Sequence, residues 1–96
     1  MLTLYQAEWC PYSQRVRMRL TELGLPFLAM QVEPRPEDRE ELREASGNGK
    51  DSIPVLLTED GNAIEGADAI VTWLDEHHAE PASARGHRAQ ARAHQV

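Results

Sequence analysis

The sequence predicts an α/β domain in which a four-stranded mixed sheet is flanked by helices. Strand-like and helix-like segments alternate along residues 1–79 in the order βαβαββα. The strand–helix–strand beginning implies a right-handed crossover and a parallel pair of strands. Two short strands joined by a tight turn later add an antiparallel pair. With 96 residues, the chain has enough material for one domain with a single modest core.

The first half of the chain holds a strand, a helix and a second strand. Apolar and polar side chains alternate over Leu2–Gln6, which predicts a strand. Pro11 suits the first turn of a helix, and Gly24 is a common type of residue just after a helix end. Between them, apolar side chains recur at the helical spacing i, i+4 and i+7: Val16, Leu20 and Leu23. The second strand is predicted over Phe27–Val32.

The second half is predicted to contain a charged helix, a hairpin and a closing amphipathic helix. Their ranges are Pro36–Ala45 for the first helix, Ile53–Thr58 and Ala63–Glu65 for the hairpin strands, and Ala67–His78 for the last helix. The Gly47-Asn48-Gly49 loop ends the first of these helices. Asp60 and Gly61 form a dipeptide typical of hairpin turns, which places the two strands side by side.

The last residues differ from the rest in charge and composition. Residues 1–79 carry seven basic and fifteen acidic side chains, whereas residues 80–96 have three arginines and one glutamate. This tail is rich in Ala, Gln and His and can bury little surface, so we expect it to be flexible, either disordered or a frayed helix. A basic tail that recruits an acidic partner is the functional alternative. The domain is therefore predicted to span residues 1–79.

Composition excludes several classes of function. The net charge of −6 argues against nucleic-acid binding, which requires a basic face. No stretch reaches the roughly 18 apolar residues of a membrane span, and the first ten residues do not resemble a signal peptide. One cysteine allows neither an internal disulfide nor a multi-cysteine zinc site. The four histidines have no cysteine or carboxylate at ligand spacing, so we expect no metal, and we expect a cytoplasmic protein with a reduced thiol.

Cys10 lies where the first predicted strand ends and the first helix begins. Free N–H groups and the helix dipole stabilise a thiolate at such a position and lower its pKa. Arg15, one turn further on, can add positive potential, and the Ser13 hydroxyl can donate a hydrogen bond to the sulfur. The alternative is that Cys10 is a buried small hydrophobic residue. Pro11 and the polar Ser13 instead indicate an exposed helix mouth and a reactive thiol.

The segment Cys10-Pro11-Tyr12-Ser13 resembles the active site of the glutaredoxin family. Downstream, Ser52-Ile53-Pro54-Val55 resembles the family's Thr-Val-Pro segment, whose proline is cis and whose preceding residue pairs with the glutathione backbone. A trans proline at the start of a strand is the alternative for Pro54. Gly66-Ala67-Asp68 resembles the stretch that binds the γ-glutamyl end of glutathione. The resemblance covers residues 1–79 and implies a thioredoxin-like fold.

The resemblance also implies a set of residues that bind the small thiol: Pro11, Tyr12, Arg15, Lys50, Ile53, Pro54, Gly66, Ala67 and Asp68. The helix N-terminus at Ala67 supplies N–H groups for a carboxylate, and Asp68 accepts the ammonium group or simply caps its helix. Lys50 faces the glycyl carboxylate or is a solvated loop lysine. Two departures stand out: Ala7 replaces a lysine found in many relatives, and Ser13 replaces the second active-site cysteine. Ser13 closes the dithiol route and leaves the monothiol route.

The implied function is a glutathione-type thiol–disulfide oxidoreductase that acts as a monomer on protein mixed disulfides. Cys10 is the nucleophile, Ser13 helps to stabilise its sulfur, and glutathione or an analogous low-molecular-weight thiol is the co-substrate. One alternative is an iron–sulfur carrier, a glutathione-bridged dimer, which the rigid Pro11-Tyr12 disfavours. The other is a binding module like the N-terminal domain of glutathione transferases, which the segments Arg15–Arg17, Ile53–Leu56 and Gly66–Ile70 also fit.

Overall fold

A computed structural model describes residues 1–47 and 49–95, so Asn48 of the predicted loop and Val96 of the predicted tail lie outside the described residues. Strands and helices follow one another as β1 (Leu2–Gln6), α1 (Pro11–Leu23), β2 (Phe27–Gln31), a 3₁₀ turn (Pro36–Asp38), α2 (Glu40–Ser46), β3 (Val55–Leu57), β4 (Ala63–Glu65), α3 (Ala67–His77) and α4 (Ala84–Ala93).

The four strands form one mixed sheet in the order β2-β1-β3-β4. β1 runs parallel to β2, as a right-handed crossover through α1 requires, and antiparallel to β3. β3 and β4 are the antiparallel hairpin. At the centre, Leu4 of β1 is opposite Ala29 on one side and Leu56 on the other. The predicted fold class, a thioredoxin-like α/β domain with a four-stranded mixed sheet, is confirmed.

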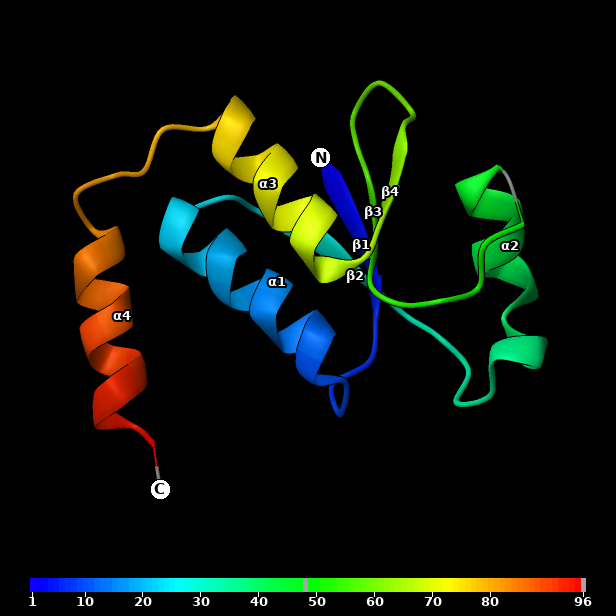
Figure 1. The fold of residues 1–96 in the computed structure, drawn as a ribbon, viewed down its shortest axis with the longest axis horizontal. Coiled ribbons are helices and arrows are strands. Elements are labelled where there is room, and N and C mark those ends of the chain that lie inside the picture. Colours follow the sequence, from blue (N-terminus) through cyan, green and yellow to red (C-terminus); the bar gives the residue numbers. More distant parts are fainter. Residues whose placement is uncertain (48, 96) are drawn as a thin grey trace.

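Helices cover both faces of the sheet, with α1 and α3 on one side and α2 on the other (Figure 1). The period of two along each strand divides its side chains between two cores. The larger core packs β1 and β3 side chains against α1 and α3, including Leu4, Leu20, Leu56, Ile70 and Leu74, all fully buried. The smaller core lies under α2 and contains Tyr5, Leu42 and Val55.

The helix predicted over Pro36–Ala45 is interrupted at Arg39. The 3₁₀ turn ends there, and α2 begins at Glu40. The Arg39 side chain explains the break: it is buried, and its guanidinium donates hydrogen bonds of 2.8–2.9 Å to the backbone carbonyls of Glu33, Pro34 and Asp51. These bonds tie the segment to two loops, so tertiary contacts override the local helical pattern.

The hairpin strands are shorter than predicted on the β3 side. β3 starts at Val55 and ends at Leu57, whereas Ile53 and Thr58 were expected within it. Thr58 instead closes the turn, since its N–H donates to Asn62 O at 2.9 Å and its carbonyl accepts from Gly61 N at 3.1 Å. The predicted turn at Asp60 and Gly61 is therefore confirmed.

The predicted tail contains a helix, α4, which lies beside α1 (Figure 1). It spans Ala84–Ala93, and Ala84 at its start is fully buried, while the expected flexibility of this segment stays a prediction. The division of the chain at residue 79 stays a prediction.

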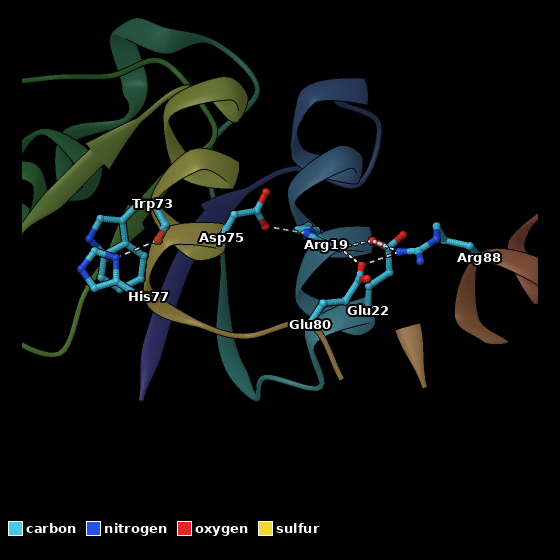
Figure 2. A network of polar contacts seen from close by, with 7 residues as sticks. All are labelled: Arg19, Glu22, Trp73, Asp75, His77, Glu80 and Arg88. Atoms are coloured by element: carbon cyan, nitrogen blue, oxygen red, sulfur yellow. Dashed lines mark hydrogen bonds and ion pairs between the residues drawn. The ribbon is translucent and has the colours of Figure 1, made fainter. Parts of the chain in front are cut away.

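A network of charged side chains joins α4 to the rest of the molecule (Figure 2). We call it the charge clasp, and its members are Arg19, Glu22, Asp75, Glu80 and Arg88. Arg19 of α1 is at its centre and contacts Asp75 at 2.8 Å and Glu80 at 2.9 Å. Arg88 of α4 reaches the same Glu80 at 2.6 Å. The clasp therefore links α1, α3, the segment after α3, and α4.

Candidate thiol site

Cys10 is the N-cap residue of α1, with an extended backbone at φ −84° and ψ 118°. Its Sγ accepts a hydrogen bond from the Ser13 N–H at 3.4 Å, which is the bond that an N-cap side chain makes with the first turn. The Cys10 N–H donates to Ala7 O at 3.1 Å, and the Ala7 N–H donates to Ser13 Oγ at 3.4 Å. The β1–α1 loop and the first helical turn thus hold the sulfur at the positive end of the helix.

The expectation of an exposed helix mouth is wrong for Cys10 and Ser13, the first and last residues of the segment that resembles an active site. Cys10 is 5% exposed and Ser13 is fully buried, whereas Trp9 and Tyr12 beside them are each 64% exposed. Ser13 is buried because its hydroxyl and its N–H both bond within the loop, to Ala7 and Cys10. Cys10 is therefore nearly buried, although its sequence neighbours Trp9 and Tyr12 are exposed.

The pKa of the Cys10 thiol is lower than its ordinary value. Burial raises it, but the hydrogen bond with the Ser13 side chain, the N–H groups of Ser13 and Tyr12, and the charge of Arg17 together lower it by more. Arg15 was expected to provide the positive charge near the sulfur. In the structure Arg17 does so, since Arg15 is engaged by Asp68 across the site. A lower pKa increases the fraction of reactive thiolate at neutral pH.

An open groove of about 470 Å³ lies next to Tyr12. It is lined by Tyr12, Arg15, Ile53, Pro54, Glu65, Gly66, Ala67, Asp68 and Ala69. Seven of the nine predicted binding residues are in this set, and Pro11 and Lys50 are the two that are not. Residues from three separate parts of the chain therefore meet beside the α1 N-terminus, and their role in binding stays a prediction.

The Ile53–Pro54 peptide bond is cis, which confirms the expectation drawn from the resemblance. The Pro54 carbonyl accepts a hydrogen bond from the Gly66 N–H at 3.0 Å, so the loop before β3 is joined to the start of α3. Gly66 is the N-cap of α3 with φ 95°, a conformation that favours glycine. The alternative that Asp68 caps this helix is therefore wrong.

The charged side chains of the groove are paired with one another. The Asp68 carboxylate forms an ion pair with Arg15, which joins α3 to α1 across the groove. Lys50 Nζ lies 3.2 Å from Glu65 Oε1. Lys50 is thus not a free loop lysine, and it does not line the groove but contacts Glu65, which does.

Gln6 and Arg17 belong to the site and were not singled out from the sequence. Arg17 donates a hydrogen bond to Gln6 Oε1 and forms an ion pair with Glu8 at 3.3 Å. A sequence signal was present, since positions 10, 13 and 17 are spaced i, i+3 and i+7 and share one helix face. What the spacing does not show is that Arg17 turns back toward the β1–α1 loop.

The histidines form no metal site in the described part of the chain, where no group of three or more His, Cys, Asp or Glu side chains is arranged to hold an ion. His77 Nδ1 lies 2.8 Å from Trp73 O, one turn earlier in α3, and the two rings stack at 4.2 Å (Figure 2). Across residues 1–47 and 49–95, no helix is both long and apolar enough to cross a bilayer.

Solved structures similar to this chain include rice GST1 in complex with glutathione, with 28% identity over 95% of this chain and a TM-score of 0.71. A diazinon-metabolizing glutathione S-transferase of the silkworm Bombyx mori has 26% identity over 82% of this chain and a TM-score of 0.70. Glutaredoxin 2 from Salmonella typhimurium, in complex with glutathione, has 20% identity over 84% and a TM-score of 0.70, and shows the fold alone.

This chain covers only 44%, 38% and 35% of those three proteins, respectively. No curated protein matches the sequence. Residues 4–82 match the family described as the N-terminal domain of glutathione S-transferase. This match fits the transferase-like alternative, and the similarity to glutaredoxin 2 shows that glutaredoxins share the fold. The chain belongs to the glutathione S-transferase N-terminal domain family.

Proposed function

We propose that this domain exchanges thiols and disulfides on mixed disulfides between proteins and glutathione, or an analogous small thiol, through Cys10. The observation that carries the proposal is the buried thiol of Cys10, with a lowered pKa, at the N-terminus of the same helix whose Tyr12 and Arg15 line the groove. The rice GST1 structure, 28% identical to this chain, was solved in complex with glutathione. It supports glutathione as the small thiol.

The reaction has two exchange steps. The Cys10 thiolate attacks the glutathione sulfur of the mixed disulfide, a new S–S bond forms at Cys10, and the protein thiolate leaves and takes up a proton. A second glutathione thiolate then attacks the glutathione sulfur on Cys10. This step releases the Cys10 thiolate and oxidised glutathione. In the net exchange one mixed disulfide and one free glutathione thiol become one protein thiol and one oxidised glutathione, so one disulfide bond is broken and one is formed. Ser13 has no sulfur, so the second step needs the external thiol.

Each part of the site has a role in this scheme. The N–H groups of the first α1 turn and the Ser13 hydroxyl stabilise Cys10 as nucleophile and as leaving group. The α3 N-terminus, with Ala67 and Ala69 in the groove wall, offers N–H groups to a carboxylate of the tripeptide. Asp68 exchanges its ion pair with Arg15 for the ammonium group of the same ligand. We expect a monomer to carry out this exchange, in a reducing compartment such as the cytoplasm.

The test is reduction of a glutathionylated peptide, with glutathione, mycothiol or γ-glutamylcysteine supplied in turn. We expect turnover with at least one of these thiols and none with Cys10→Ser. Ser13→Cys is the matched gain-of-function variant: it creates a Cys-Pro-Tyr-Cys segment and should form an internal disulfide under mild oxidants. Equal rates for the parent and Cys10→Ser would contradict the proposed function.

The family match favours a second candidate, the glutathione-binding part of a transferase. A domain of this kind binds glutathione without exchanging disulfides. Binding of glutathione by Cys10→Ser and by the parent with equal affinity, together with no exchange by either, would favour it. An iron–sulfur carrier, the third alternative, would be recognised by visible absorbance after reconstitution with iron, sulfide and glutathione.

A further inference from the structure

α1 carries three arginines at alternate positions, and each has different partners. Arg15 pairs with Asp68 across the groove, and Arg19 is the centre of the charge clasp. Arg17 alone of the three turns back to the segment before Cys10. The role of Arg17 considered below rests on the proposed function, because it concerns the same sulfur.

Arg17 contacts two residues of the segment before Cys10, Gln6 and Glu8, which lie on either side of Ala7. One guanidinium nitrogen donates to Gln6 Oε1 and another contacts Glu8 Oε1 at 3.3 Å. Gln6 is 1% exposed at the end of β1. The residue between these partners is Ala7, whose carbonyl accepts the Cys10 N–H and whose N–H donates to Ser13 Oγ. Ala7 anchors the thiol through these two bonds. Displacement of Arg17 would therefore free its two neighbours, Gln6 and Glu8, from their contacts with α1.

Gln6 is itself fixed by the neighbouring strand. Its Nε2 donates to Gln31 Oε1 of β2 at 3.1 Å, so its Oε1 remains oriented toward α1. A neutral amide is the buried partner of Arg17, which means that this contact satisfies the guanidinium without cancelling its charge. The Gln31–Gln6–Arg17 chain thus places a positive charge on the loop side of the thiol.

The other charged groups near Cys10 are largely neutralised by their partners. On the α3 side Asp68 is paired with Arg15, and on the sheet side Lys50 is paired with Glu65. Glu8 opposes Arg17, but its side chain is 80% exposed while that of Arg17 is 20% exposed. Water screens the exposed carboxylate more than the half-buried guanidinium. Arg17 therefore leaves a net positive field at the sulfur.

We propose that Arg17 is a positioning residue that fixes the Gln6–Glu8 segment under Cys10 and supplies the positive charge for its thiolate, with Glu8 as the attenuating charge. Burial raises the pKa of Cys10, the Ser13 bonds and the Tyr12 N–H lower it, and Arg17 is the one full charge in that set.

The experiment uses alkylation of the single cysteine by iodoacetamide, a neutral probe, as a function of pH. We expect Arg17→Gln to raise the midpoint by about half a pH unit or more, because it removes a nearby opposite charge. Arg17→Lys should restore most of the shift, since it keeps the charge, and Glu8→Gln should move the midpoint downward. The matched control is Arg19→Gln, which removes the same charge from the same helix but at the charge clasp.

Each outcome either supports or overturns the role of Arg17. A midpoint that is unchanged in Arg17→Gln, with only a lower melting temperature, would show a purely structural residue. Equal shifts in Arg17→Gln and Arg19→Gln would show a general effect of net charge. If Arg17→Gln does not fold, an unchanged midpoint in Glu8→Gln overturns the assignment. The alkylation midpoint requires no glutathione, so failure of the proposed exchange activity in the parent would be seen separately.

Discussion

The two ends of α1 show two different ways of holding polar groups. At its N-terminus, one buried sulfur is held by backbone N–H groups and a buried hydroxyl. Toward its C-terminal end, the charge clasp holds α4 with long side chains, of which Asp75, Glu80 and Arg88 are 36–46% exposed. The first arrangement uses groups that the fold has already fixed, and the second must order flexible side chains.

This difference predicts how each end responds to its surroundings. Backbone N–H groups lose no rotamer freedom when they bond a thiolate, and burial protects them from salt. Exposed ion pairs lose side-chain entropy and are screened, so each contributes little. The thiol site should therefore be insensitive to ionic strength under conditions where α4 separates from α1.

The largest effect is expected at Leu20, which lies on the core-facing side of α1. Leu20 is fully buried in the core under α1, so Leu20→Ala should lower the free energy of unfolding by about 2–5 kcal/mol. Met18, on the same helix and 37% exposed, provides the control, and Met18→Ala should cost far less. Urea denaturation measures both. Similar losses of unfolding free energy in the two variants would contradict the burial of Leu20 in the core against α1.

The next effect concerns the thiol end alone. Ser13→Ala removes a hydroxyl whose bond lowers the pKa of Cys10 against the raising effect of burial, so the alkylation midpoint should rise, by about one pH unit. Ser46→Ala is the matched control: Ser46 is also buried, and its hydroxyl donates to Arg43 O at 3.1 Å, but it lies in α2. It should leave the midpoint where it is in the parent. A shift in both variants would contradict the local explanation.

The pH dependence of stability follows from the same thiol. A pKa that is lower in the folded than in the unfolded chain means that the folded state binds fewer protons between the two values, so stability rises with pH there. This contribution is complete above the unfolded pKa and is lost as the pH falls through the folded one. Urea midpoints of the parent, compared with those of Cys10→Ser, should diverge in favour of the parent as the pH rises toward 9. A constant difference would show that the thiol pKa is not lowered.

The smallest effect is expected at the charge clasp. Hydrogen bonds from Arg88 and Arg19 lower the pKa of Glu80 to about 2 from its usual 4.5. The contribution of Glu80 to the docking of α4 should therefore be present at pH 5 and be lost as the pH falls from about 4.5 to 2. At neutral pH, Glu80→Gln should speed amide hydrogen exchange in α4 by about two- to five-fold.

The control for the clasp is Glu76→Gln, at an exposed glutamate of α3 for which no ion pair is found among the described residues. It should leave α4 exchange unchanged. Addition of 1 M salt should reproduce the Glu80→Gln effect while the Cys10 alkylation midpoint moves little. If salt changes both the α4 exchange rate and the Cys10 alkylation midpoint strongly, the proposed difference between the two ends of α1 is wrong.

Local signals predicted the elements that position the thiol. Pro11 and Gly24 mark the ends of α1, and Gly24 adopts φ 69° with its N–H bonded to Leu20 and Thr21 carbonyls. The Asp60-Gly61 turn and the helix start at Ala67 were predicted in the same way. Such signals depend on the conformational limits of one or two residues, so they act before any tertiary contact forms.

The sequence patterns around Arg39 and Ser13 led to wrong predictions, because the side chains of both residues bond to backbone groups elsewhere in the chain. The Pro36–Ala45 pattern reads as one helix, but Arg39 is held by carbonyls of two loops. Ser13 reads as an exposed polar residue, but Ala7 accounts for its burial. In both cases a polar side chain found a backbone partner that no periodicity shows.

By itself, the sequence determined the order of the elements, the sheet they form and the place of Cys10 at a helix N-terminus, because these depend on hydrophobic period, chain direction and capping. Only the tertiary structure decided which arginine serves the sulfur, which carboxylate pairs across the groove, and where α4 lies. Arg15, Arg17 and Arg19 have the same side chain within five residues, and nothing local distinguishes them. Their partners come from β1, α3 and the segment after α3, so folding alone assigns each charge its place.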